Sequence, residues 1–150
     1  MPRYYIAYGS NMSLKQMAIR CPTAKLVGKA VLKDWQLVFK VFADIEKRSG
    51  NYVPILLWDI TPEDESSLDI YEGYPSFYKK VNIKVTFDAL DENLVPTGEK
   101  KDVTAMAYVM RDRVTRILPS RGYLETIAKA YQIFGFNMGV LAEALKEAHK

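Results

Sequence analysis

The chain has 150 residues, of which 49% are hydrophobic and 26% charged, a composition typical of a globular domain. Its net charge of +3 comes from interspersed acidic and basic residues, which argues against the basic stripe of a nucleic-acid-binding protein. The only cysteine, Cys21, excludes an internal disulfide and a thiolate zinc site, and the only histidine, His149, stands at the C-terminal end of the sequence. Acid–base chemistry must therefore come from carboxylates, tyrosines or lysines.

The first part of the chain is predicted to form strands and one short helix. A β-branched and aromatic segment, Arg3–Tyr8, ends at turn-forming residues, and Ser13 can then cap a helix that runs to about Arg20. Three further segments are predicted strands: Lys25–Leu32, Trp35–Phe42 and Tyr52–Ile60. The charged segment Ala43–Asn51 is predicted to be a loop, and the end of the chain is expected to fray at His149.

The clearest helix signal follows the third of these strands. Thr61 is a capping residue, Pro62 occupies the first helical position, and Asp64 occupies the capping-box position. Gly73 is a natural left-handed stop for that helix. The pattern therefore predicts a helix with both ends defined by local chemistry.

The rest of the chain is predicted to form a hairpin and two helices. The hairpin strands are Tyr78–Phe87 and Asp102–Met110, joined by a polar excursion over Asp88–Lys101, and the helices are Ser120–Phe134 and Met138–Ala148. This order predicts an α+β fold, with a small mixed or antiparallel β-barrel flanked by helices. We expect one domain over residues 1–150.

A first candidate site is the turn Tyr8-Gly9-Ser10-Asn11-Met12, where a strand runs into a helix start. Glycine allows a sharp turn there, and the following amides would face a carboxylate, a phosphate or a developing oxyanion. The turn lacks the lysine of a phosphate-binding P-loop and the second glycine of a nucleophile elbow. The plainer interpretation is a strand-to-helix turn built from ordinary turn residues.

A second candidate is Glu72, in the last turn of the predicted helix and followed by Gly73-Tyr74-Pro75 and Tyr78. The helix dipole disfavours a carboxylate at this end, although the penalty is small for a solvated side chain. If Glu72 instead points into a tyrosine-lined pocket, the dipole and desolvation both raise its pKa and suit it to general acid–base work near neutral pH. A third segment, Pro119-Ser120 with Tyr123, combines a helix cap with a tyrosine that either closes a pocket or simply packs.

Together these segments resemble the γ-glutamylcyclotransferase-like family. The resemblance runs in the family's order through the Tyr8–Met12 turn, Trp58 at the end of a strand, Leu68-Asp69 before Glu72-Gly73-Tyr74-Pro75 and Tyr78, and Pro119-Ser120 with Tyr123. The pairing of the first turn with the glutamate segment about 60 residues later makes the match specific. The turn is similar to that of the branches that act on γ-glutamyl amino acids and γ-glutamylamines.

The resemblance implies an enzyme that cyclises a γ-glutamyl group to 5-oxoproline and releases an amino acid or an amine. It implies that Glu72 is the catalytic acid and base, that residues Tyr8, Gly9, Ser10, Asn11 and Met12 bind substrate, and that Tyr78 and Tyr123 line the pocket. The turn amides would hold either the substrate α-carboxylate or the oxyanion. Two departures concern the substrate: Ile55 replaces a common glycine, and Lys80 replaces a frequent arginine.

We expect a cytoplasmic protein that needs no cofactor or metal, binds no nucleic acid or membrane, and acts as a monomer or homodimer on a small γ-glutamyl substrate. One competing hypothesis is a non-catalytic module that binds a γ-glutamyl group or another small carboxylate. Another is a structural partner that docks through the apolar faces of the C-terminal helices over Ser120–Ala148.

Overall fold

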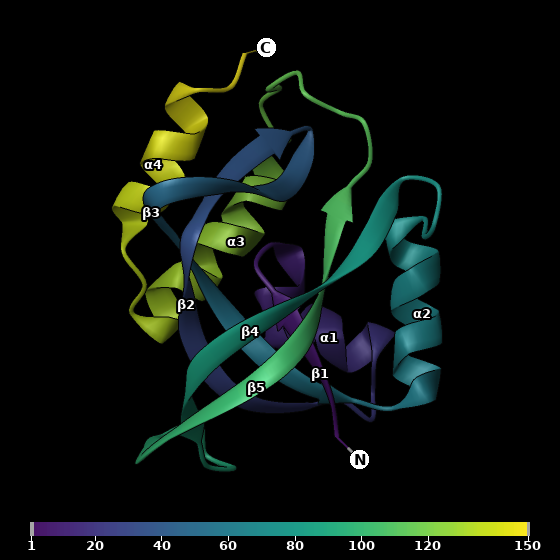
Figure 1. The fold of residues 1–150 in the computed structure, drawn as a ribbon, viewed down its shortest axis with the longest axis vertical. Helices are drawn as coiled ribbons and strands as arrows, with labels where there is room; N and C mark the ends of the chain where they lie inside the picture. The colour runs from purple at the N-terminus through teal and green to yellow at the C-terminus, as the bar shows by residue number, and fades with distance from the viewer. Residues whose placement is uncertain (1, 150) are drawn as a thin grey trace.

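The computed structural model describes residues 2–149 and shows five strands closed into a barrel in the order β1–β3–β2–β4–β5 (Figure 1). The strands are β1 (Arg3–Ala7), β2 (Lys25–Lys40), β3 (Phe42–Ile60), β4 (Tyr78–Leu90) and β5 (Pro96–Met110). Neighbouring strands pair antiparallel except at the closure, where Tyr5 of β1 pairs in parallel with Met106 of β5. The predicted α+β fold with a small mixed barrel is thus confirmed.

The helices lie outside this barrel, with α2 on one side and α3 and α4 on the other (Figure 1). They are the short 3₁₀ helix η1 (Ser10–Met12), α1 (Leu14–Arg20), α2 (Pro62–Glu72), α3 (Arg121–Phe134) and α4 (Met138–Lys146). Helix α3 buries Ile127, Tyr131 and Phe134, and α4 buries Leu141. These buried side chains belong to the main hydrophobic core, so the apolar faces proposed for a docking role are covered by the chain itself.

The predicted loop over Ala43–Asn51 is wrong, because this segment belongs to β3 and pairs with β2 in a long hairpin. The chain reverses at Val41, whose φ of 72° is left-handed, and pairing resumes at once between Lys40 and Phe42. Charged residues indicated a loop, yet Lys40 and Asp44 are both buried because they pair with each other. The two strand predictions before this loop also merge into the single strand β2.

The predicted excursion over Asp88–Lys101 is mostly strand as well. Strand β4 continues to Leu90, β5 begins at Pro96, and only a tight turn separates them. The Asp91 carboxylate closes that turn by accepting from the amides of Asn93 and Val95. This end of the hairpin is exposed to water, so its residues are mostly polar. They therefore do not show the alternation of polar and apolar residues that marks a half-buried strand.

His149 is held by backbone hydrogen bonds and is not frayed. The His149 amide donates to the carbonyl of Arg116 at 3.1 Å, and the His149 carbonyl accepts from the amide of Leu118 at 2.8 Å. These backbone contacts hold the end of the chain against the segment that precedes α3. Among the described helices, none is long and apolar enough to cross a membrane.

Candidate active site

The turn after β1 is shaped by a close approach at Gly9. A Cβ atom at Gly9 would lie 3.2 Å from both the Ala43 Cβ and the Tyr123 hydroxyl, so a larger residue would push these neighbours away. The following residues form η1, in which the Met12 amide donates back to the Gly9 carbonyl at 3.1 Å. The amides of Ser10 and Asn11, at the start of this helix, donate to no acceptor within residues 2–149.

Helix α2 places Glu72 at its last residue, beside that turn. The helix begins at the predicted capping box of Thr61 and Asp64 and ends at Gly73, whose φ of 65° is left-handed. Glu72 is half-buried, and burial raises the pKa of its carboxyl group to about 7, while the Arg20 guanidinium opposes part of that rise. A carboxyl group that titrates near neutrality can both accept and donate a proton.

Glu72 and the turn line the same small inner pocket. It is lined by Tyr5, Ile6, Tyr8, Gly9, Ser10, Asn11, Ala43, Glu72, Tyr78, Tyr108 and Tyr123. All but one of the site residues expected from the sequence therefore converge on one space. The exception is Met12, which is 1% exposed in the hydrophobic core and does not line the pocket.

Half of the ten tyrosines of the chain meet in this inner pocket, and most of their hydroxyl groups have protein partners. Tyr8 donates to the carbonyl of Tyr108 at 2.6 Å, and Tyr108 donates to the Asp69 carboxylate at 2.6 Å. Tyr78 donates to the carbonyl of Ala43 at 2.8 Å. Burial raises the pKa of each of these phenols, so they stay protonated at neutral pH.

Tyr5, Tyr108 and Ala43 line the site but were not among the residues expected from the sequence. Tyr5 lies in the first strand, and Tyr108 reaches the same pocket only because β5 closes the barrel against β1. Ala43 lies in the segment predicted to be a loop, and it contacts other pocket residues through its backbone N–H and C=O groups. The local sequence carries no signal for this convergence, apart from the aromatic character of β1.

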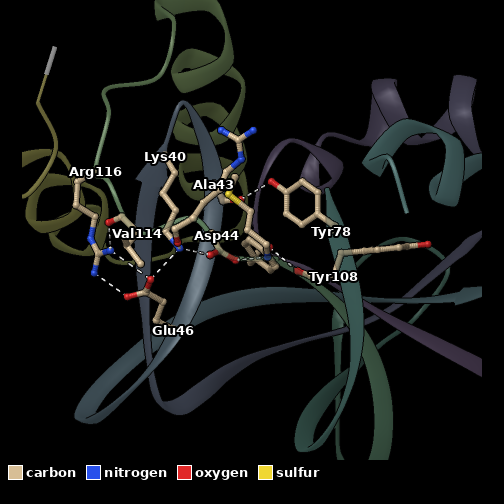
Figure 2. A network of polar contacts seen from close by, with 11 residues as sticks. Lys40, Ala43, Asp44, Glu46, Tyr78, Tyr108, Val114 and Arg116 are labelled. Atoms are coloured by element: carbon tan, nitrogen blue, oxygen red, sulfur yellow. Dashed lines mark hydrogen bonds and ion pairs between the residues drawn. The ribbon is translucent and has the colours of Figure 1, made fainter. Parts of the chain in front are cut away.

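A buried ion-pair network supports the backbone of Ala43 from behind the pocket (Figure 2). The Lys40 ammonium lies 2.7 Å from the Asp44 carboxylate and 2.8 Å from that of Glu46, and it donates to the Arg113 carbonyl. The second Asp44 oxygen accepts from the amide of Met110 at 3.0 Å. The residue before Asp44 is thereby fixed between β2, β5 and the segment that leads to α3.

Ala43 in turn holds two pocket tyrosines. Its amide donates to the Tyr123 hydroxyl at 3.0 Å. Its carbonyl accepts from Tyr78 at 2.8 Å, as Figure 2 shows. The backbone of one residue therefore sets the positions of two phenols that come from α3 and β4.

A second, larger and more open cavity, the outer cavity, adjoins the inner pocket. It shares Glu72, Tyr78 and Tyr123 with the inner pocket and is otherwise lined by Phe42, Ile70, Tyr71, Gly73 and Phe77. Phe42 makes edge-on contacts with Tyr123 and Phe77, at ring-centroid distances of 5.5 and 6.4 Å. The site thus has a narrow polar interior and an apolar, aromatic entrance, with Glu72 lining both.

The two departures from the family pattern lie outside both cavities. Ile55 is fully buried in the barrel core, so the larger residue affects barrel packing and not the wall of the pocket. Lys80 lies 2.7 Å from the Glu65 carboxylate and 2.9 Å from that of Asp69, and its ammonium stands over the Tyr74 ring at 4.2 Å. Tyr71 lines only the outer cavity, and Tyr74 lines neither.

The remaining polar candidates carry no chemistry in the described chain. Cys21 is buried, and burial raises the pKa of its thiol to about 11, so it is protonated at neutral pH. Among residues 2–149, no three histidine, cysteine, aspartate or glutamate side chains gather in a way that could hold a metal ion.

A small closed barrel with a half-buried carboxyl group, free turn amides and a ring of phenols defines a pocket suited to general acid–base chemistry on a small polar molecule. Comparison with known families gives this pocket its context. The model of the gamma-glutamyl cyclotransferase, AIG2-like family matches residues 5–125. The chain belongs to this family.

Individual relatives agree with that assignment. The chain is 31% identical over 119 residues to a gamma-glutamylcyclotransferase of Mus musculus, covering 71% of this chain and 58% of the relative. It is 30% identical over 135 residues to a gamma-glutamylcyclotransferase of Bos taurus, covering 82% of this chain and 66% of the relative. The chain therefore spans less than two thirds of the length of these relatives.

A solved structure described as a gamma-glutamyl cyclotransferase superposes with a TM-score of 0.74 at 25% identity. The match covers 99% of this chain and 89% of that chain. The arrangement of the barrel and its helices therefore matches that of this solved structure along nearly the whole chain.

Proposed function

We propose that this protein cyclises a γ-glutamyl group to 5-oxoproline and releases an amine or an amino acid, with Glu72 as the catalytic acid and base. One observation carries the proposal: Glu72, with a pKa near 7, lines the same inner pocket as the Tyr8–Asn11 turn that marks the family resemblance. The relatives named gamma-glutamylcyclotransferase support the same reaction.

The reaction needs only a group that moves protons, because the nucleophile belongs to the substrate. The Glu72 carboxylate takes one proton from the substrate α-ammonium group, and the resulting amine attacks the γ-carbonyl carbon, whose π electrons move onto oxygen. Glu72 then protonates the leaving nitrogen, and the carbon–nitrogen bond to that nitrogen breaks as the carbonyl re-forms. A second proton passes from the ring nitrogen through Glu72 to the released amine, which restores the carboxylate.

Folding the substrate for this attack is the other task of the site. Correctly oriented intramolecular reactions can gain about 7–11 kcal/mol over bimolecular ones, so a pocket that holds the bent conformer supplies much of the rate. The amides of Ser10 and Asn11 have no acceptor within the described chain, and we assign them to the substrate α-carboxylate. Tyr78 and Tyr123, held by the backbone of Ala43, would then form the pocket wall next to the turn.

The outer cavity is where the leaving group would lie, because it meets the inner pocket at Glu72. Its walls at Phe42, Ile70 and Phe77 are apolar, which favours a leaving group with an apolar side chain. A Phe42→Ser variant should lose about 10-fold in kcat/KM for γ-glutamylphenylalanine and change little for γ-glutamylglycine. Equal losses for the two dipeptides would contradict this assignment of the outer cavity.

The decisive experiment measures 5-oxoproline released from a panel of γ-glutamyl amino acids and γ-glutamylamines. Glu72→Gln should lower kcat by about 10²–10⁴-fold, because the proton carrier is lost while the side-chain shape is kept. Glu65→Gln, on the same helix but outside both cavities, is the matched control and should retain catalysis.

Two results would overturn the proposal in different ways. Full activity in Glu72→Gln would show that another group moves the proton. No turnover by the wild-type protein, together with a thermal shift caused by 5-oxoproline or glutamate, would favour a binding module that uses the same pocket without catalysis.

A further inference from the structure

A directed chain of hydrogen bonds runs from Arg20 into the inner pocket. The Arg20 guanidinium donates to the Asn11 side-chain oxygen, and the Asn11 side-chain nitrogen donates to the Tyr5 hydroxyl oxygen at 2.9 Å. Asn11 and Tyr5 are 3% and 4% exposed, so the bond between them is shielded from water, whereas Arg20 at the outer end is partly exposed.

The direction of this chain is fixed by chemistry. A guanidinium group can only donate, so the Asn11 atom that faces Arg20 must be the oxygen, and the atom that faces Tyr5 must be the nitrogen. The Tyr5 oxygen is therefore an acceptor, and its own proton must point elsewhere. Within residues 2–149 the Tyr5 hydroxyl donates to no group, and no hydrogen bond joins it to Glu72, although both line the inner pocket.

The other inner-pocket tyrosines differ from Tyr5 in this respect. Tyr8, Tyr78 and Tyr108 each donate their proton to the protein. Tyr123 also accepts, but from the neutral amide of Ala43, and it lies between the inner and outer cavities. Tyr5 alone combines a place confined to the inner pocket with a chain of donors that starts at a cation.

We propose that Tyr5 is a catalytic residue whose hydroxyl donates a hydrogen bond to the oxyanion that forms on the substrate γ-carbonyl, and that Asn11 and Arg20 are positioning residues that aim its proton. This inference rests on the proposed cyclisation. Tyr5 keeps its proton throughout, and the oxyanion returns to a carbonyl when the leaving nitrogen departs. With Tyr5 in this role, the turn amides are left for the α-carboxylate.

The chemistry of the surroundings supports a donor that stays protonated. Burial and the nearby Glu72 carboxylate raise the pKa of Tyr5 well above its usual value. Each bond in a chain of hydrogen bonds polarises the next, so the charge on Arg20 strengthens the Tyr5 proton as a donor. A fixed donor in a pocket that excludes water stabilises developing charge more than a solvated one does.

The first test is Tyr5→Phe, which removes the hydroxyl and keeps the ring. We expect kcat to fall about 10²–10³-fold with KM changed by less than about threefold, because the bond is strongest in the transition state. Tyr131→Phe is the matched control: this buried hydroxyl lies in α3, lines neither cavity and has no hydrogen-bond partner in the described chain, so its removal should leave kcat unchanged.

The second test is Asn11→Asp, which keeps the shape of the side chain but reverses the direction of its hydrogen bond with Tyr5. Aspartate can still accept from Arg20, but it cannot donate to Tyr5, so the Tyr5 proton turns toward the carboxylate and away from substrate. We expect a loss in kcat similar to that of Tyr5→Phe and no further loss in the double variant, since both changes remove one interaction. Additive losses, or full activity in Asn11→Asp with a normal melting temperature, would overturn the proposal.

Binding of 5-oxoproline, measured by calorimetry, separates this inference from the proposed function. The lactam oxygen would accept from Tyr5, so Tyr5→Phe and Asn11→Asp should each raise Kd by about 5–30-fold. If the wild-type protein binds 5-oxoproline without turning over any γ-glutamyl substrate, the cyclisation fails and this shift still tests the donor. Unchanged affinity in both variants would contradict the role of Tyr5, and no binding by the wild-type protein would contradict both proposals.

Discussion

Helix α2 carries two glutamates, Glu65 and Glu72, whose carboxyl groups are shifted in opposite directions. Glu65 accepts from Arg3 at 2.9 Å and from Lys80 at 2.7 Å, and these two cations lower its pKa to about 2. The carboxyl group of Glu72, two helical turns further on, has no hydrogen-bond partner within residues 2–149, and burial raises its pKa to about 7. The same side chain on the same helix is therefore a permanent anion at one position and a titrating group at the other.

The difference lies in what the nearby cations are free to do. Arg3 and Lys80 reach Glu65 directly, whereas Arg20, the cation near Glu72, donates to Asn11 and Gln16 and stands over the Tyr71 ring at 3.6 Å. Arg20 therefore acts on Glu72 only through space. A carboxyl group is kept available for proton transfer when its nearest cation is bound to other groups.

The largest effect is expected from a third carboxylate that extends this comparison, Asp44. It is 2% exposed and pairs with Lys40, which is 4% exposed, so its removal leaves the buried Lys40 ammonium with Glu46 as its one remaining carboxylate partner and leaves the Met110 amide without its acceptor. Asp44→Ala should lower the free energy of unfolding by about 3–5 kcal/mol, measured by urea denaturation. The double variant Lys40→Met with Asp44→Leu should recover most of this loss, and a single-variant loss below about 1 kcal/mol would contradict the prediction.

Glu65→Gln should cost less, about 1–3 kcal/mol at pH 7, because Glu65 is partly exposed to solvent. A carboxyl group with a lowered pKa stabilises the fold above its unfolded value of about 4.5, and this contribution is lost as pH falls through about 2. The difference between wild type and variant should therefore shrink as unfolding is measured at successively lower pH. A difference that stays constant between pH 7 and pH 2 would show that its origin is not ionic.

The effect of Glu72→Gln on the free energy of unfolding should be smaller and opposite in sign, raising it by about 1–2 kcal/mol at pH 8. The raised pKa means that the folded state favours the neutral acid, so ionisation of Glu72 destabilises the wild-type fold. This destabilisation is absent below about pH 4.5 and grows until pH exceeds about 7. Thermal unfolding at pH 4.5 and pH 8 tests this directly. A variant less stable than wild type at pH 8 would show that Glu72 is a structural anion like Glu65.

The smallest effect concerns the pH profile of catalysis. Because Glu72 must be ionised to act as a base, kcat/KM should rise with pH through a midpoint near 7. Arg20 lowers that pKa, so Arg20→Met should move the midpoint to higher pH. In Tyr5→Phe the midpoint should stay in place while the plateau falls. An unshifted midpoint in Arg20→Met would show that the charge of Arg20 does not affect the pKa of Glu72.

The parts of the fold that depend on local chemistry could be predicted from the sequence. Helix α2 follows the cap at Thr61 and ends before Gly73, as its capping box and left-handed glycine indicate, and α3 follows the cap at Ser120. Glu72 and all of the Tyr8–Met12 turn except Met12 line one pocket, and the sequence indicated them as candidates because their residue types stand at specific positions along the chain.

The remaining parts depend on contacts between distant segments. The charges of Asp44 and Glu46 indicated a loop, yet they lie in a strand because Lys40 and Arg116 neutralise them, and Arg116 is far away in sequence. Tyr5 and Tyr108 reach the pocket only when the barrel closes between β1 and β5. No local pattern carries that information, since it depends on pairing that the folded chain alone creates.

The backbone of Ala43 gives this site two hydrogen-bonding groups that truncation of a side chain cannot remove. Its N–H and C=O groups hold Tyr123 and Tyr78, so substitutions other than proline at position 43 keep both bonds and change only the methyl group that faces the Gly9 turn. An alanine scan would pass over this residue, and a catalogue of catalytic side chains would leave it out. Replacement of that amide by an ester, through chemical synthesis, would delete the bond to Tyr123 without altering any side chain.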